Sequence, residues 1–237
     1  MVGQTNSQRY RWLLFDADGT LFDYDRAERA ALAGALQQIG VAFAPEHLAA
    51  YRRFNQEAWH ALERGQITPA VLKVRRFELL FQAIGVDHSP ADFSARYLDA
   101  IADCAELLDG ALDVVQALRS RYRMAIVTNG LSAVQRRRFE RSAIRDCIVE
   151  IIISEEIGTA KPAREFFDVT FTRLGDPPKA EVLMIGDNWS SDIVGGANYG
   201  LDTCWFNPGR QLRPDAPSLT REVASLPELA AWLSGAE

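Results

Sequence analysis

The chain has 237 residues, 48% of them hydrophobic, and a formal net charge of −6. This length and apolar content are sufficient for one core domain with a modest insert. The acidic balance disfavours nonspecific contact with nucleic acid or a membrane surface, because both require a basic face. No apolar run reaches the roughly 18 residues of a membrane-spanning helix. We therefore expect neither a nucleic acid nor a membrane as a partner.

The three cysteines, Cys104, Cys147 and Cys204, are far apart and follow no metal-binding spacing such as CxxC. An odd number of scattered cysteines is typical of reduced thiols in a cytoplasmic protein. The first residues, MVGQTNSQRYR, contain no apolar segment of the kind found in a signal peptide. We therefore expect a cytoplasmic protein, and no sequence feature predicts its oligomeric state.

The first predicted element is a short buried strand at residues 11–15, RWLLF. A long region, residues 25–108, then carries apolar residues at helical spacing and no segment that predicts a strand. It therefore predicts an all-helical insert. Its helix signals are the N-cap residues Thr68 and Ser89, each followed by proline, and the terminating glycines Gly40, Gly65 and Gly85.

From residue 110 onward, predicted strands alternate with predicted helices. The strands are MAIVTNG, CIVEIIIS, EVLMIGD and DTCWF, and a last helix, SLPELAAWL, begins at Ser225. This alternation predicts a parallel sheet with right-handed crossovers. We expect an α/β fold: a doubly wound, mostly parallel, Rossmann-like core domain of residues 1–23 and 108–237. An all-helical cap domain of residues 24–107 is inserted into it.

Polar residues follow four of the predicted strands, at the point where each strand ends. In a doubly wound sheet, ligands bind beyond the carboxyl ends of the strands, so parallel strands would bring these side chains to one edge. The residues are Asp16 and Asp18 after the first strand, Thr128 and Asn129 after the second, Lys161 after the third, and Asp187 and Asp192 after the fourth.

The chemistry of this set indicates a site for a phosphoryl group. Crowded carboxylates repel one another, and their burial is costly unless a cation compensates the charge. Oxygen ligands without His or Cys suit Mg²⁺, which commonly binds one or two carboxylates together with substrate phosphate. Phosphoryl transfer depends mostly on positioning and electrostatic stabilisation, which Lys161 and the metal would supply.

In chain order, the segments DADGT, TNG, AKP and GDNWSSD resemble the four motifs of the haloacid dehalogenase-like phosphohydrolases. The resemblance extends over the whole chain, including a helical cap inserted after the first motif. It implies a phosphatase that uses Mg²⁺. Asp18 favours this chemistry over the dehalogenase branch of the superfamily, which lacks a carboxylate at this position because a halide leaving group needs no proton.

The resemblance implies a role for each motif residue. Asp16 is the nucleophile that forms an aspartyl-phosphate. Asp18 protonates the leaving oxygen and then activates water, and its backbone carbonyl binds Mg²⁺. Thus the catalytic residues are Asp16, Asp18 and Lys161; the phosphate-binding groups are Thr128, the N–H of Asn129, and Lys161. The metal ligands are Asp16, Asp18 and Asp187, and Asp192 orients a metal-bound water or Lys161.

A wider likeness points to the substrate. The segments FDADGTLFDYD, ISEEIGTAKP and VLMIGDNWSSDIVGGANYGLDTCWFN, with GQIT and RRFE in the cap, resemble the bacterial pyrimidine 5′-nucleotidases of this superfamily. The resemblance implies a small-molecule phosphomonoester substrate, a pyrimidine nucleoside monophosphate. These segments lie mostly in the core, and similarity there determines chemistry better than substrate.

Several alternatives remain open at this stage. The same core would serve a phosphatase for sugar phosphates or phosphoglycolate, a phosphosugar mutase, or a noncatalytic ligand-binding module. Each site residue also has an ordinary structural interpretation: Asp18 as an Asx turn, Thr128 as a strand-end hydroxyl, Lys161 as a solvated loop residue, and Asp192 as an acid at a helix N-terminus.

The cap contains candidate substrate contacts, but structural roles are favoured for them. Trp59 and Phe77, at helical spacing, are expected in the core of the cap. Arg75 and Arg76 are expected on a solvated face. The segment QRRRFERSAIR, residues 135–145, is expected to be a solvated helix with Phe139 packed inward.

Overall fold

The computed structural model describes residues 9–214 and 219–235. The chain divides into two compact units. The core unit holds the described residues up to Asp23, Ala105–Ser132, and those from Phe139 onward. The helical unit holds Tyr24–Cys104 and Ala133–Arg138. No helix among the described residues is long and apolar enough to cross a bilayer.

The core unit is built on a six-stranded sheet in the order β3-β2-β1-β4-β5-β6, and every pair of neighbours is parallel. This confirms the doubly wound α/β fold. The order reverses between β1 and β4, the place where such sheets bind ligands. The strands are β1 (Trp12–Phe15), β2 (Arg123–Thr128), β3 (Glu150–Ile153), β4 (Val182–Gly186), β5 (Asp202–Phe206) and β6 (Arg221–Val223).

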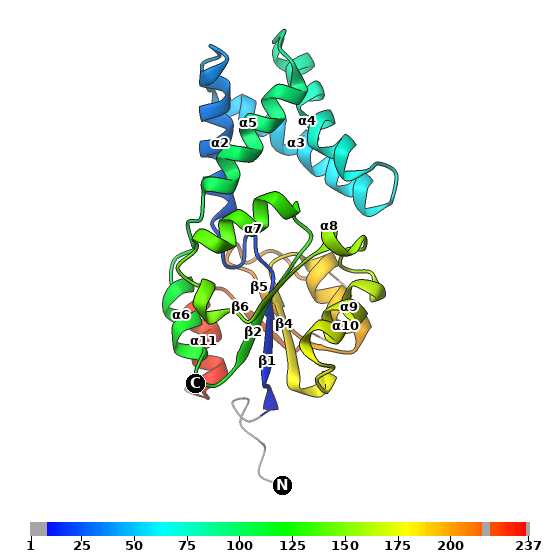
Figure 1. The fold of residues 1–237 in the computed structure, drawn as a ribbon. Helices are drawn as coiled ribbons and strands as arrows, with labels where there is room; N and C mark the ends of the chain where they lie inside the picture. Colours follow the sequence, from blue (N-terminus) through cyan, green and yellow to red (C-terminus); the bar gives the residue numbers. More distant parts are fainter. Residues whose placement is uncertain (1–8, 215–218, 236–237) are drawn as a thin grey trace. The chain divides into compact units, whose positions relative to one another are not determined.

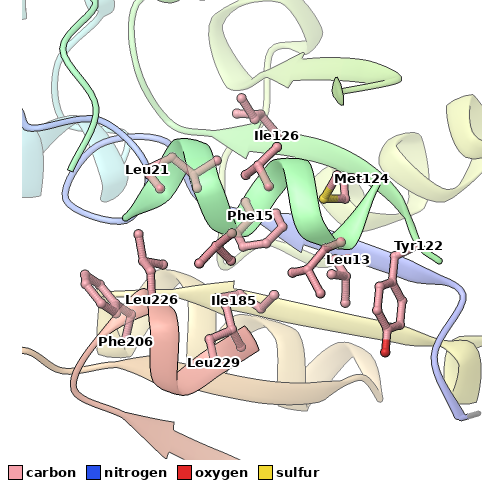
Figure 2. Packing of buried hydrophobic residues seen from close by; sticks show 14 of the residues in the cluster. Leu13, Phe15, Leu21, Tyr122, Met124, Ile126, Ile185, Phe206, Leu226 and Leu229 are labelled. Atoms are coloured by element: carbon pink, nitrogen blue, oxygen red, sulfur yellow. The ribbon is translucent and has the colours of Figure 1, made fainter. Parts of the chain in front are cut away.

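Helices cover both faces of this sheet (Figure 1). Because side chains alternate along a strand, Leu13 and Phe15 of β1 face the cluster formed with α6 (Ala111–Leu118) and α11 (Leu226–Ser234). Figure 2 shows this packing, with Leu226 and Leu229 of α11 lying against the strand residues. Trp12 and Leu14 face the opposite cluster, formed with α9 (Arg164–Leu174) and α10 (Gly195–Tyr199). Burial on both faces explains why the strands are continuously apolar.

The helical unit contains α2 (Tyr24–Gln38), α3 (Pro45–Glu63), α4 (Pro69–Ile84) and α5 (Pro90–Asp103). The predicted N-caps are confirmed: the side chain of Thr68 accepts a hydrogen bond from the N–H of Val71, and that of Ser89 from the N–H of Asp92. Phe77 is buried, as expected, and stacks on Tyr51 with the ring centroids 5.4 Å apart.

Two arginines contradict the expectation of solvated faces. Arg76 is only 2% exposed, because its guanidinium lies over the rings of Tyr51, Phe77 and Tyr97 and donates a hydrogen bond of 2.7 Å to Asn55. Arg138 is fully buried, and its Nε donates to the carbonyl of Cys104 at 2.9 Å. The pattern of charged residues along a helix does not reveal whether aromatic rings and carbonyl groups surround its arginine side chains in the folded protein.

Smaller elements complete the chain. The strand β6 was not expected. The helix expected over SDIVGGANYG, residues 191–200, begins two residues earlier, as a π-helix at Trp189–Val194 that continues into α10. Phe139 packs against the core cluster, as expected. The three cysteines are free thiols, as expected. The remaining elements are α7 (Ser132–Arg141), α8 (Ser154–Ile157), and the 3-10 turns at Arg145–Cys147 and Lys179–Glu181.

Candidate active site

The carboxyl ends of β1 and β4, which are neighbours in the sheet, place two of the expected carboxylates side by side. Asp16 directly follows β1, and its N–H donates to the carbonyl of Ile185 at 2.8 Å, so the ladder continues past the strand end. Asp187 directly follows β4. Carboxylate oxygens of Asp16, Asp187 and Asp192 all lie within 4.8 Å of one another. The sheet topology therefore brings together residues that are about 170 positions apart.

Lys161 is the cation at the centre of this cluster. Its side chain is 1% exposed, and its Nζ donates to Asp16 at 2.6 Å, to Asp192 at 2.7 Å and to the carbonyl of Val127 at 2.7 Å. These three acceptors satisfy all three protons of the ammonium. Burial lowers the pKa of Lys161, but the charges of Asp16 and Asp192 outweigh that effect and raise it. The interpretation of Lys161 as a solvated loop residue is wrong.

Asn129 holds the main chain of Lys161. Its Oδ1 accepts from the N–H of Lys161, and its Nδ2 donates to the carbonyl of Lys161, both at 2.8 Å. This pair of bonds links the loop after β2 to the loop that carries the lysine. The sequence predicted a role for Asn129 only through its main-chain N–H. The side-chain contact joins residues 32 positions apart, so no local pattern could have revealed it.

Thr20 and Gly19 shape the surroundings of Asp187. The buried hydroxyl of Thr20 donates to Oδ1 of Asp187 at 2.9 Å. Gly19 has a φ of +82°, and a Cβ at this position would lie 2.7 Å from Oδ2 of the same carboxylate. Glycine is thus required both for the backbone conformation and for the close approach. The GT pair of DADGT therefore holds the distant Asp187, a role that the sequence did not predict.

Asp192 is fully buried, and both of its oxygens are engaged. Oδ1 accepts from Lys161 and from the hydroxyl of Ser191, and Oδ2 accepts from the N–H of Asn188 at 3.0 Å. A Cβ on Gly186 would overlap this carboxylate, so glycine at the end of β4 makes room for it. The orienting role expected for Asp192 stays a prediction.

The electrostatics of the cluster fit a hard divalent cation. The buried carboxylates of Asp16 and Asp192 and the half-buried carboxylate of Asp187 surround one ammonium, which leaves an excess of negative charge. Burial raises the pKa of Asp16 well above its ordinary value, and the neighbouring Asp192 and Asp187 add to that effect, while Lys161 opposes it. Burial and the charge of Asp192 raise the pKa of Asp187 to about 7. A cation near Asp16 and Asp187 would remove this repulsion, and an all-oxygen donor set suits Mg²⁺.

The other expected residues lie on the same edge of the sheet. Thr128 ends β2 and is buried, and its hydroxyl accepts from the N–H of Gly130 at 3.1 Å. Asp18 lies in the turn after β1, where it forms an isolated bridge with Phe22, and its side chain is not among the three clustered carboxylates. The role expected for Asp18 in metal binding involves its backbone carbonyl, and that role stays a prediction.

Comparison with known proteins identifies the family. Residues 10–200 match the haloacid dehalogenase-like hydrolases. The chain is 36% identical over 221 residues to the pyrimidine 5′-nucleotidase YjjG of Escherichia coli, covering 93% of this chain and 96% of that protein. It is 34% identical over 221 residues to the pyrimidine 5′-nucleotidase PynA of Streptococcus pneumoniae, covering 93% of each chain.

A solved structure shows the same fold. The magnesium-bound HAD-hydrolase YfnB of Bacillus subtilis superposes with a TM-score of 0.89 at 34% identity, covering 95% of this chain and 99% of that one. These matches confirm the resemblance read from the four motifs, and with it the expectation of an enzyme rather than a noncatalytic module. The chain belongs to the haloacid dehalogenase-like hydrolase family.

Proposed function

We propose that this protein is a Mg²⁺-dependent phosphatase that hydrolyses phosphomonoesters through an aspartyl-phosphate at Asp16. The observation that carries the proposal is the buried Lys161 ammonium, which bridges Asp16 and Asp192 beside Asp187. Such a cluster holds the carboxylate of Asp16 in a fixed position beside a fixed ammonium group. Preorganised charge of this kind is what phosphoryl transfer requires.

The reaction follows in two displacements. A carboxylate oxygen of Asp16 attacks phosphorus, the bond from phosphorus to the ester oxygen breaks, and the carboxyl group of Asp18 gives its proton to that oxygen. Asp18, now a carboxylate, takes a proton from water as the water attacks the aspartyl-phosphate. Inorganic phosphate leaves, and both aspartates return to their starting forms.

The remaining site residues position the reacting groups. Lys161 keeps one oxygen of Asp16 fixed at 2.6 Å, which leaves the other oxygen to react. The hydroxyl of Thr128 and the N–H of Asn129 bind phosphate oxygens from the neighbouring strand end. Asp16, the backbone carbonyl of Asp18 and Asp187 would hold Mg²⁺. When bound, the cation supplies positive charge for the phosphoryl oxygens and keeps the carboxylates ionised.

Pyrimidine nucleoside monophosphates are the proposed substrates. Two relatives of more than 30% identity that match over 93% of the chain are pyrimidine 5′-nucleotidases. We further propose that residues 24–107 form the cap domain that selects the substrate, and that residues 1–23 and 108–237 carry the chemistry. A phosphatase for sugar phosphates is the competing assignment, and it differs only in the substrate that the cap admits.

A panel assay tests the proposal. Phosphate release is measured with Mg²⁺ on UMP, dUMP, dTMP, AMP, GMP, phosphoglycolate and several sugar phosphates, with D16N as the matched inactive control. We expect the highest kcat/KM on the pyrimidine monophosphates and no turnover by D16N. A preference for sugar phosphates would replace the substrate assignment. Substantial turnover by D16N would overturn the mechanism.

A further inference from the structure

A buried indole holds the main chain of the expected metal ligand Asp187. Trp205 lies on β5, opposite Gly186 of β4 in the parallel register. Its side chain is almost completely buried, and its Nε1–H donates to the carbonyl of Asp187 at 2.9 Å. Trp205 therefore reaches across the sheet edge to the residue that directly follows β4.

The same indole also packs against the far end of this loop. Trp189 begins the π-helix and lies edge-to-face on Trp205, with the ring centroids 4.8 Å apart and the planes at 67°. Asp187, Asn188 and Trp189 are consecutive, so Trp205 holds the segment at both ends. The direction in which the Asp187 side chain leaves the backbone depends on this segment.

Two hydrogen bonds from different elements thus determine the position of Asp187. Thr20, after β1, donates to the carboxylate, and Trp205, on β5, donates to the backbone carbonyl. Neither bond alone is sufficient, because a carboxylate held only at its oxygen can follow a shift of its main chain. The backbone at Gly19 approaches the same carboxylate so closely that a Cβ there would lie 2.7 Å from Oδ2 of Asp187. Replacing a residue that hydrogen-bonds to a metal ligand typically weakens metal binding, because the ligand is no longer held in its orientation.

We propose that Trp205 is a positioning residue for Asp187, and that its N–H, rather than its bulk, determines how tightly the site binds Mg²⁺. The inference rests on the proposed function, because it takes Asp187 as a ligand of the cation. Trp205 itself touches neither the cation nor the substrate. Its contribution acts through the backbone of Asp187.

The test is calorimetric titration of Mg²⁺ into the full-length wild type, W205F and W189F, without substrate. Phenylalanine keeps an aromatic ring but lacks the N–H. We expect W205F to bind Mg²⁺ about fivefold to tenfold more weakly, the effect of losing one hydrogen bond. W189F is the matched control, since the indole N–H of Trp189 has no hydrogen-bond partner among the described residues. We expect its affinity for Mg²⁺ to change less than twofold.

Kinetic measurements distinguish a positioning role for Trp205 from a general loss of structure. The kcat of W205F should fall at limiting Mg²⁺ and return to the wild-type value as Mg²⁺ is raised, with KM for substrate unchanged. If W205F does not fold, W205L, whose side chain has no hydrogen-bond donor, is measured in the same way. Equal Mg²⁺ affinity in wild type and the folded Trp205 variant would overturn the inference and leave the proposed function intact. Absence of Mg²⁺ binding to the wild type would overturn both.

Discussion

The side chain of Asn129 and the main chain of Lys161 are joined by two reciprocal hydrogen bonds of 2.8 Å. The side-chain amide of Asn129 thus pairs with both the N–H and the carbonyl of Lys161, as the backbone of a neighbouring strand would. Lys161 in turn places its ammonium against Asp16 and Asp192. The position of the Lys161 ammonium thus depends on an amide group in the loop after the second strand.

Replacement of Asn129 should test this dependence. N129A removes both hydrogen bonds and should lower the free energy of unfolding by about 2 kcal/mol. It should also lower kcat, because the lysine loop loses its anchor. N129D is the graded control, since a carboxylate can still accept from the Lys161 N–H but cannot donate to its carbonyl. Urea unfolding and phosphate release measure the two effects. A wild-type stability for N129A would contradict the anchoring role.

Lys161 should matter for stability as well as for turnover. K161M leaves two buried carboxylates without their cation, and removal of one partner from a buried ion pair costs about 3–5 kcal/mol. Adding D192N should recover part of this loss, because it removes one of the unpaired charges. Both variants should remain inactive, since the charge that balances Asp16 is gone. Urea unfolding of the single and double variants, in the absence of Mg²⁺, provides the comparison. A double variant less stable than K161M would count against the charge argument.

Two glycines of the same chain should respond to alanine in opposite directions. A Cβ on Gly186 would overlap the carboxylate of Asp192, so G186A should destabilise the core and abolish activity. Gly34 lies inside α2, and a Cβ there would meet nothing within 4 Å. G34A should therefore stabilise the protein by about 0.5–1 kcal/mol, the helix preference for alanine. Thermal unfolding of G186A and G34A measures the two effects. Equal shifts in Tm would contradict the steric explanation.

Mg²⁺ should stabilise the folded protein through the carboxylate cluster. A ligand that binds only the native state adds about 2.7 kcal/mol at 100 times its Kd. We expect the Tm of the wild type to rise with Mg²⁺ and to return to its starting value when EDTA is added. D187N should lose most of this rise, because one of the proposed ligands loses its charge. An equal rise in D187N would show that Mg²⁺ stabilises the protein elsewhere.

The adjacent arginines of α4 offer a matched pair in the helical unit. Arg76 is buried among three aromatic rings, whereas the side chain of Arg75 is 57% exposed. R76A should lower the free energy of unfolding by about 2–3 kcal/mol, from lost cation–π contacts and the hydrogen bond to Asn55. R75A should change it by less than about 0.5 kcal/mol. Chemical unfolding followed by circular dichroism measures the stability of both variants. A similar loss of stability in R75A and R76A would contradict the difference in burial between the two arginines.

The sequence predicted most of the elements because their signals are local. Apolar runs, N-cap residues followed by proline, and terminating glycines each act within a few residues. The polar residues at the strand ends were also visible, because parallel topology implies one common edge. The short β6 was missed, since three residues at the edge of a sheet carry no periodicity.

By itself, the sequence determined which chemical groups are available: the carboxylates of Asp16, Asp18, Asp187 and Asp192, and the amine of Lys161. Only the tertiary structure decided how they are held. The contacts of Asn129 with Lys161, of Thr20 and Trp205 with Asp187, and of Arg76 with its three rings all join residues from different elements. Burial and hydrogen bonding depend on what surrounds a side chain in space. Neighbours along the chain do not specify those surroundings until the sheet and helices have packed.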